Sequence, residues 1–122
     1  MGSLQVDYIF FALSLLALDA VFMRYIGPLY RKHMGFTGVN VVFALLAYAV
    51  MTLSWRFIQG DPKKAALMGL IVFGTYAFTL KAVFSSTYTN QMMLSELLWG
   101  TVILFPVATW IASRGASVWK AR

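Results

Sequence analysis

The chain has 122 residues, of which 61% are hydrophobic and only 11% are charged, and its formal net charge is +6. Soluble domains carry about 25% charged residues, and a domain this small has much surface to cover, so the composition excludes a soluble globular protein and a disordered chain. Because the chain has no cysteine and a single histidine, it also excludes a disulfide scaffold, thiolate chemistry and a histidine-rich zinc site within one chain.

Four apolar stretches follow one another along the chain, at residues 6–25, 39–58, 65–84 and 91–113. Each is close to the roughly 20 residues that a helix needs to cross a hydrocarbon core of about 30 Å. Backbone polar groups cannot stay unpaired in lipid, and the hydrophobicity is continuous rather than alternating, so we expect helices. The predicted fold class is therefore all-α: a single domain over residues 1–122, forming an integral membrane bundle of four transmembrane helices with short loops.

Local signals predict where these helices begin and end. Gly27 and Pro28 predict the end of the first helix, because proline lacks an N–H group and the residue before it avoids the α region. Asp61, followed directly by a proline, predicts the N-cap of the third helix. Thr89 or Asn90 is expected to cap the fourth helix.

Proline and glycine also occur inside the predicted helices. Pro106 lies within the fourth helix and predicts a kink there. Gly69, Gly74 and Gly100 are typical of sites where two helices approach closely, because glycine carries no side chain. The alternative for Gly100, next to Trp99, is the lining of a pocket.

The distribution of Lys and Arg predicts the orientation of the bundle. An even number of spans puts both termini on one side, which holds six of these residues, whereas the opposite side holds three. The six are Arg56, Lys63, Lys64, Arg114, Lys120 and Arg122, and the three are Arg24, Arg31 and Lys32. The excess predicts that both termini lie on the cytoplasmic side of the membrane or, in an organelle, on the stromal or matrix side. It also explains the net charge without a nucleic-acid partner.

Three charged residues are predicted to lie inside the membrane, where a charge is costly. Lys81 and Glu96 belong to neighbouring antiparallel helices at similar depth, which predicts an ion pair, and Asp19 is the other candidate partner for Lys81. Thr79 and Trp99 complete the predicted polar cluster. The cluster is either a structural ion pair that fixes helix packing or a relay for protons or ions.

Residues at the ends of the spans indicate contact with lipid. Arg31, Lys32 and His33 are candidates for binding a lipid phosphate or a pigment, and a solvated loop is the plainer alternative. Six aromatic residues at span ends are typical of belts at the membrane–water interface. They are Tyr25, Tyr30, Trp55, Tyr88, Trp110 and Trp119.

Several short motifs resemble one known family. They are Leu18-Asp19, Leu29-Tyr30-Arg31-Lys32-His33-Met34-Gly35, Thr75-Tyr76, Phe78-Thr79, Ala82-Val83-Phe84 and Glu96-Leu97-Leu98-Trp99-Gly100-Thr101. Together they resemble the small four-span membrane proteins grouped as the domain of unknown function 2177 family. The resemblance covers residues 7–113 and implies the fold, but it supplies no reaction. The family carries an acid where Ala77 stands and an amide where Leu80 stands, so it implies that this chain lacks part of the family's polar site.

Two functions from different classes are compatible with the sequence. The first is an accessory subunit of a larger membrane complex, such as an energy-transducing or pigment-containing one, with lipids and other membrane subunits as partners and with bound lipid or a chlorophyll-type pigment. The alternative is a small proton, ion or solute transporter that uses Asp19, Lys81 and Glu96. An enzyme is not expected, because no nucleophile–base pair or metal cluster supports a membrane enzyme acting on a lipid or quinone.

Overall fold

The computed structural model describes residues 2–35, 38 and 40–121 and is helical almost throughout, with no strand in that part of the chain. The elements are α1 (Gly2–Met34), α2 (Val41–Thr52), α3 (Trp55–Ile58), α4 (Pro62–Val83), α5 (Asn90–Leu98), the π-helix η1 (Trp99–Leu104) and α6 (Phe105–Ala121). Four segments are long and apolar enough to cross a membrane: Val6–Met34, Val41–Ile58, Pro62–Val83 and Asn90–Ala121. The all-helical fold and the four candidate spans are thus confirmed.

The predicted end of the first helix at Gly27 and Pro28 is wrong, because α1 continues through both residues to Met34. The clash that normally breaks a helix before proline involves the Cβ of the preceding residue, and Gly27 has none. Ile26 and Tyr30 are buried on either side of the proline, so packing holds this turn in place. The basic residues at 31–33 therefore belong to the last turn of α1, where positive charge favours the helix.

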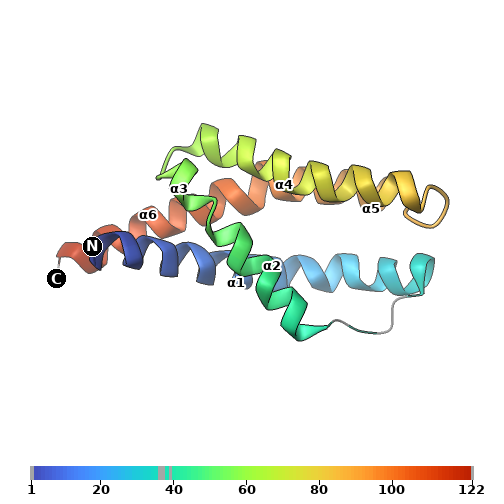
Figure 1. Cartoon of the computed structure of the whole chain (residues 1–122), viewed down its shortest axis with the longest axis horizontal. Coiled ribbons are helices and arrows are strands. Elements are labelled where there is room, and N and C mark those ends of the chain that lie inside the picture. The colour runs from blue at the N-terminus through green and yellow to red at the C-terminus, as the bar shows by residue number, and fades with distance from the viewer. Residues whose placement is uncertain (1, 36–37, 39, 122) are drawn as a thin grey trace.

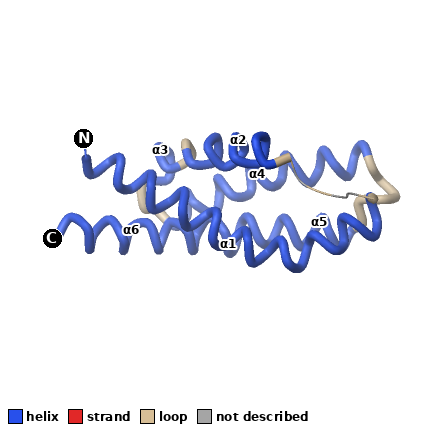
Figure 2. Tube along the Cα trace, turned by 90° about the horizontal axis from the view of Figure 1, so that it is seen from below, coloured by secondary structure: helices blue, strands red, loops and turns tan. Residues whose placement is uncertain are grey.

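Both termini lie at one end of the elongated bundle, as Figure 1 shows, and α1 runs the whole length beside the chain's last helical segment. The turn between α4 and α5 lies at the opposite end. α2 begins near the middle of the long axis and runs obliquely toward the end that holds the termini, and the view in Figure 2 agrees. The end with the α4–α5 turn is therefore built from α1, α4 and α5.

Two predicted caps are present at the starts of α4 and α5. The Asp61 carboxylate accepts a hydrogen bond from the Lys63 backbone N–H at 2.9 Å. The Thr89 hydroxyl accepts one from the Met92 N–H at 3.2 Å. Each cap satisfies a backbone donor that the first turn of a helix leaves without a partner. The two helices consequently begin where the sequence predicts.

Glycine allows α4 and η1 to touch through their backbones. A Cβ on Gly69 would lie 2.8 Å from the carbonyl carbon of Gly100, and a Cβ on Gly100 would lie 2.7 Å from the Cβ of Phe73. Both distances are too short for real atoms, so the prediction of close approach is confirmed for this pair. At Gly74 the nearest atom would be 3.7 Å away, an ordinary contact.

The irregularity predicted at Pro106 takes the form of a π-helix that ends two residues earlier. The Phe105 N–H donates to the carbonyl of Gly100, five residues back, instead of four. Because Pro106 has no N–H, the helix at this point lacks one of the bonds that would hold it in α geometry. The wider turn begins at Trp99, directly after α5.

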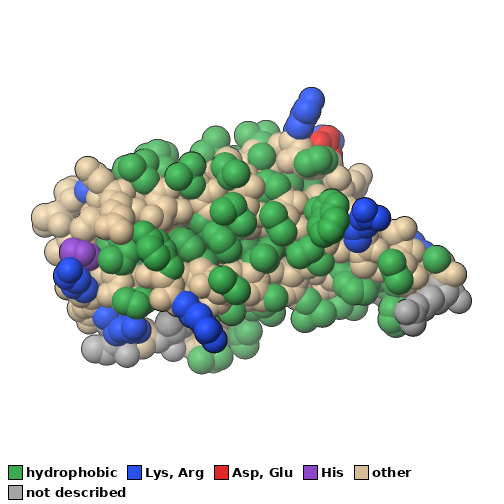
Figure 3. All heavy atoms as spheres, turned by 180° about the vertical axis from the view of Figure 1, so that it is seen from behind, with side chains coloured by type: hydrophobic (Ala, Val, Ile, Leu, Met, Phe, Trp, Pro, Cys, Tyr) green, Lys and Arg blue, Asp and Glu red, His purple; other side chains and the backbone are tan. Residues whose placement is uncertain are grey.

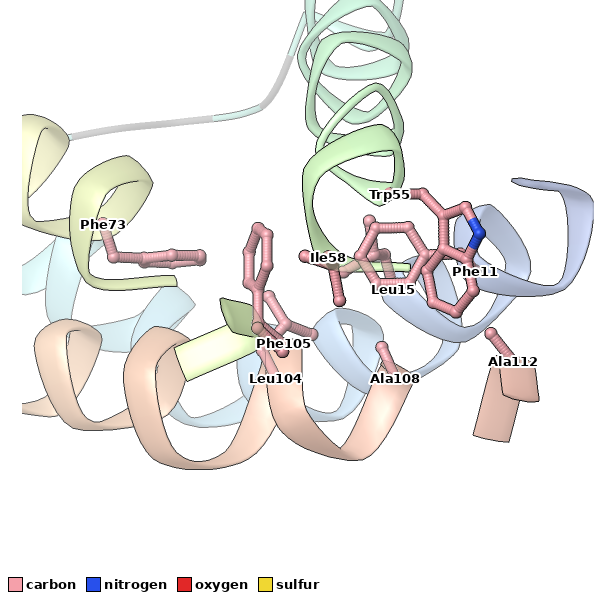
Figure 4. Packing of buried hydrophobic residues seen from close by; sticks show 10 residues of the cluster. Phe11, Leu15, Trp55, Ile58, Phe73, Leu104, Phe105, Ala108 and Ala112 are labelled. Atoms are coloured by element: carbon pink, nitrogen blue, oxygen red, sulfur yellow. The ribbon is translucent and has the colours of Figure 1, made fainter. Parts of the chain in front are cut away.

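An apolar cluster fills the half of the bundle near the termini. Its members come from α1, α3, α4, η1 and α6: Phe11, Leu15, Trp55, Ile58, Ala65, Phe73, Leu104, Phe105, Ala108 and Ala112. In Figure 4 the Phe11 ring lies against Trp55, and the ring centroids are 5.2 Å apart. Alanines on α6 keep that helix close to α1. The cluster consists entirely of hydrophobic side chains.

The aromatic belts predicted at the span ends are only half right. Tyr25, Trp110 and Trp119 are exposed, as a belt requires, but Tyr88 is completely buried and Trp55 is only 3% exposed. Tyr30 is buried as well. The buried rings belong to clusters of buried residues that come from several helices. Two of these three rings belong to the candidate site.

Candidate functional site: a carboxyl and phenol network

Two carboxyl groups, Asp19 on α1 and Glu96 on α5, lie inside the bundle. Their exposed fractions are 8% and 3%. Burying a carboxyl group is costly unless hydrogen bonds compensate for the lost water. Both residues were predicted as intramembrane charges, and the structure shows which side chains surround them.

Asp19 is held by donors from two other elements. The Tyr48 hydroxyl of α2 donates to Oδ2 of Asp19. The indole Nε1–H of Trp99, at the start of η1, donates to Oδ1 at 3.1 Å. Both oxygens of the carboxyl group therefore have a protein donor, and the π-turn is the element that presents Trp99 to α1.

Glu96 is bound by a chain of phenols. The Tyr30 hydroxyl donates to Oε1 of Glu96, and the hydroxyl oxygen of Tyr76 lies 2.8 Å from that of Tyr30. Tyr76 is 46% exposed on α4, so this chain links a buried carboxyl group to the surface of the bundle. The side-chain atoms can pass a proton along these hydrogen bonds because each phenol both donates and accepts.

Tyr88 approaches Glu96 from the α4–α5 turn. Its hydroxyl oxygen and Oε2 of Glu96 are both buried, and neither has a hydrogen-bond partner within ordinary distance. Burial, followed by the charge of Glu96, raises the pKa of the Tyr88 phenol above its usual range. The Tyr88 phenol therefore keeps its proton.

A stacked aromatic pair lies next to the carboxyl group of Asp19. Phe22 of α1 and Trp99 lie nearly parallel, with ring centroids 4.8 Å apart. Asp19, Phe22 and Tyr30 lie on one face of α1, since they are spaced by three and eight residues. We call the seven residues that carry the two carboxyl groups, the phenols and the indole the polar network: Asp19, Tyr30, Tyr48, Tyr76, Tyr88, Glu96 and Trp99.

The predicted ion pair of Lys81 with Glu96 or Asp19 is not formed. The Lys81 Nζ donates instead to the backbone carbonyls of Ser85 at 2.8 Å and Tyr88 at 3.0 Å. Carbonyl groups that follow a helix C-terminus lack helical partners and attract a cation. In the described part of the chain the one ion pair joins Lys120 to Asp7, at 3.4 Å.

The other predicted site residues lie outside the network, apart from Trp99. Thr79 is exposed on α4, and the residue of that helix buried against the phenols is Ala77. Arg31 and Lys32 are exposed in the last turn of α1, with His33 partly exposed beside them. Within the described residues, no group of three or more His, Asp and Glu side chains could hold a metal ion.

The network also includes Tyr30, Tyr48, Tyr76 and Tyr88, which the sequence analysis did not identify as members. A signal for Tyr30 exists: it continues a buried stripe of α1 that includes Asp19 and Ile26. Ending the helix at Pro28 hid that stripe. No comparable signal exists for Tyr48 and Tyr76, because their partners depend on how helices from distant parts of the chain pack together.

Comparisons with protein-family profiles, with curated proteins and with solved structures find no match to this chain. The resemblance to the domain of unknown function 2177 family thus stays a prediction.

Proposed function

We propose that the chain is a small membrane protein that transfers protons, alone or together with a small solute, through Asp19 and Glu96. One observation carries the proposal: both carboxyl groups are buried, both accept hydrogen bonds from side-chain donors, and neither has a cation as partner among the described residues. Ionisable groups that face the interior of a membrane bundle are typical of proton and ion pathways.

The absence of a lysine from the network separates this proposal from a structural role. A buried ion pair fixes packing because each charge neutralises the other. Here Lys81 binds backbone carbonyls of the α4–α5 turn, and among the described residues the donors to the two carboxyl groups are phenols and an indole. A carboxyl group in such surroundings can take up and release a proton without breaking an ion pair.

The Lys and Arg count favours an orientation with both termini in the cytoplasm. In this orientation the α4–α5 turn faces the opposite side of the membrane. Tyr88 is completely buried between Glu96 and that turn, and Tyr76 provides a contact with the surface of the bundle.

The proposal is tested in proteoliposomes that contain the full chain and a pH-sensitive dye. After a pH jump, we expect Glu96→Gln and Asp19→Asn each to lower the rate of proton flux, because an amide cannot exchange a proton at neutral pH. The matched control is Asp7→Asn, which removes the carboxylate that pairs with Lys120 outside the network. Equal proton flux in all four proteins, or no proton flux in vesicles that contain the unmodified chain, would contradict the proposal.

A second candidate function, an accessory subunit of a membrane complex, is favoured by α2. None of the twelve residues of this fully described helix is buried, and Phe43, Val50 and Val42 are each about two-thirds exposed. A helix with this little contact to its own chain offers a surface to other subunits. Extraction in a mild detergent followed by size analysis tests this candidate, and recovery as a monomer or homodimer would count against it. Absorbance of the extracted material tests for a pigment.

A further inference from the structure

A groove of about 550 Å³ runs between α1 and α6 near the termini, at the end of the bundle opposite the α4–α5 turn. Phe10 of α1 lines one side, and Trp110, Arg114 and Trp119 of α6 line the other. The groove lies apart from the polar network, none of whose residues lines it. It combines an apolar surface with a single cation, Arg114.

Glycine shapes the bottom of this groove. A Cβ on Gly115 would lie 2.8 Å from Cδ1 of Phe10, so the ring of Phe10 fits only because position 115 has no side chain. Trp110 and Trp119 are each 61% exposed and stand at the edges. Exposed tryptophans are typical of the level in a membrane where acyl chains meet headgroups.

Arg114 has no acidic side chain available within the chain. Its guanidinium carbon lies 5.4 Å from the centroid of the Trp110 ring, which holds the charge beside the groove. The chain has only four Asp and Glu residues. Asp7 pairs with Lys120, Asp61 caps α4, and the other two belong to the polar network.

The surroundings add further positive charge at this end. Figure 3 shows hydrophobic side chains across the middle of one face, with Lys and Arg side chains toward the two ends. Arg56, Lys63 and Lys64 belong to α3 and to the first turn of α4, at the same end as the groove. A negative ligand therefore gains from the local field as well as from direct contact.

We propose that this groove binds an anionic phospholipid. One acyl chain lies along Phe10, Trp110 and Trp119, and the phosphate contacts the Arg114 guanidinium, which forms paired hydrogen bonds with phosphate oxygens. An anionic phospholipid is thus the ligand that we assign to this end of the molecule. Its binding requires that the four helices span a membrane. It does not depend on proton transfer by the polar network.

The experiment uses the full chain in phosphatidylcholine vesicles and measures quenching of tryptophan fluorescence by brominated lipids. Brominated phosphatidylglycerol and brominated phosphatidylcholine are compared at the same mole fraction. Trp110 and Trp119 are exposed, whereas Trp55 is buried and Trp99 is only partly exposed within the polar network, so most of the quenching reports on the groove. We expect half-maximal quenching at about a fivefold lower fraction of the anionic lipid, a preference that corresponds to about 1 kcal/mol for one basic residue.

Arg114→Gln is expected to abolish this preference, and the substitution is safe for folding because Arg114 is exposed. The matched control is Arg56→Gln, an exposed arginine at the same end that does not line the groove. Trp110→Phe combined with Trp119→Phe should remove most of the quenching. Arg56→Gln should keep most of the preference, because Arg56 contributes to the local field but does not contact the ligand. Equal quenching by the two lipids, or a preference that survives Arg114→Gln undiminished, would overturn the proposal.

Discussion

The two halves of this bundle are filled by different kinds of side chain, apolar near the termini and partly polar near the α4–α5 turn. Near the termini, α1 and α6 approach closely across alanines, and the space between them is filled by rings such as Phe11 and Phe105. Near the α4–α5 turn, the space is filled by Tyr30, Tyr88 and the carboxyl group of Glu96. The apolar half is stabilised mainly by packing, whereas the polar half depends on hydrogen bonds to its buried oxygens, and the Tyr88 hydroxyl and Oε2 of Glu96 lack them.

The difference indicates that the apolar half contributes mainly to stability and that the polar network carries the proposed proton transfer. Substitutions in the apolar half should change the stability of the fold and leave proton flux per folded molecule unchanged. Substitutions in the polar network should change flux more than packing, because the phenols are replaceable by rings of nearly the same shape. Four predictions test this division, from the largest expected effect to the smallest.

The largest effect is expected for Gly69→Ala at the contact of α4 with η1. The new methyl group would meet the backbone of Gly100, which cannot move aside as a side chain can. We expect the free energy of unfolding to fall by about 1–3 kcal/mol or more, measured by denaturant titration in detergent micelles. Gly74→Ala is the control, because its methyl group would find only ordinary contacts. Equal losses for the two variants would refute the backbone contact.

The next effect is expected for Trp99→Phe, which retains a ring against Phe22 but removes the N–H donor to Asp19. An unsatisfied buried acceptor costs about 1–3 kcal/mol, so the unfolding free energy should fall within that range. A double-mutant cycle with Asp19→Asn measures the coupling between the two residues. Purely additive effects would show that the hydrogen bond contributes nothing.

A similar effect on stability and a clear effect on flux are expected for Tyr30→Phe. This variant disconnects Glu96 from Tyr76 and removes the Tyr30 donor from a buried carboxyl oxygen while preserving the ring, so it should cost about 1–3 kcal/mol of stability. Proton flux in proteoliposomes should fall. Tyr76→Phe removes only the exposed end of the chain of phenols, so its loss of stability should be smaller. If neither variant changes flux, the phenols do not carry protons.

The smallest effect is expected for Lys81→Met. The lysine donates to two carbonyls of the α4–α5 turn, so its loss should cost about 0.5–1.5 kcal/mol and leave flux unchanged. A pronounced loss of flux, equal to that of Glu96→Gln, would restore Lys81 to the polar network.

The sequence is sufficient to predict the elements of this fold and the residues that cost most to bury. Hydropathy gives the four helices, the caps at Asp61 and Thr89 follow from local chemistry, and Gly69 and Gly100 are where helices touch. Asp19 and Glu96 are recognisable as buried charges because nothing near them in the sequence neutralises them. These features depend on short stretches of chain.

The partners of the carboxyl groups could not be predicted in the same way. Two antiparallel helices can be neighbours while the side chains of a given pair of residues point in different directions. Lys81 donates to carbonyls of the α4–α5 turn, whereas Glu96 accepts from Tyr30, so the two do not form an ion pair. Tyr48 reaches Asp19 only because α2 crosses α1 obliquely at that level. The rotation and crossing of helices are set by the whole bundle, so they are not encoded in spacing alone.

The passage of α1 through Pro28 has a consequence for the bilayer itself. The span Val6–Met34 has 29 residues, and Val41–Ile58 has 18, so the two differ in length by about 16 Å as helices. Lipids beside α1 would meet a longer helix than lipids beside α2 and α3. Such hydrophobic mismatch is relieved by tilting the long helix or thinning the bilayer beside the short one. If the four helices span a membrane as proposed, the protein should deform the bilayer unevenly around it.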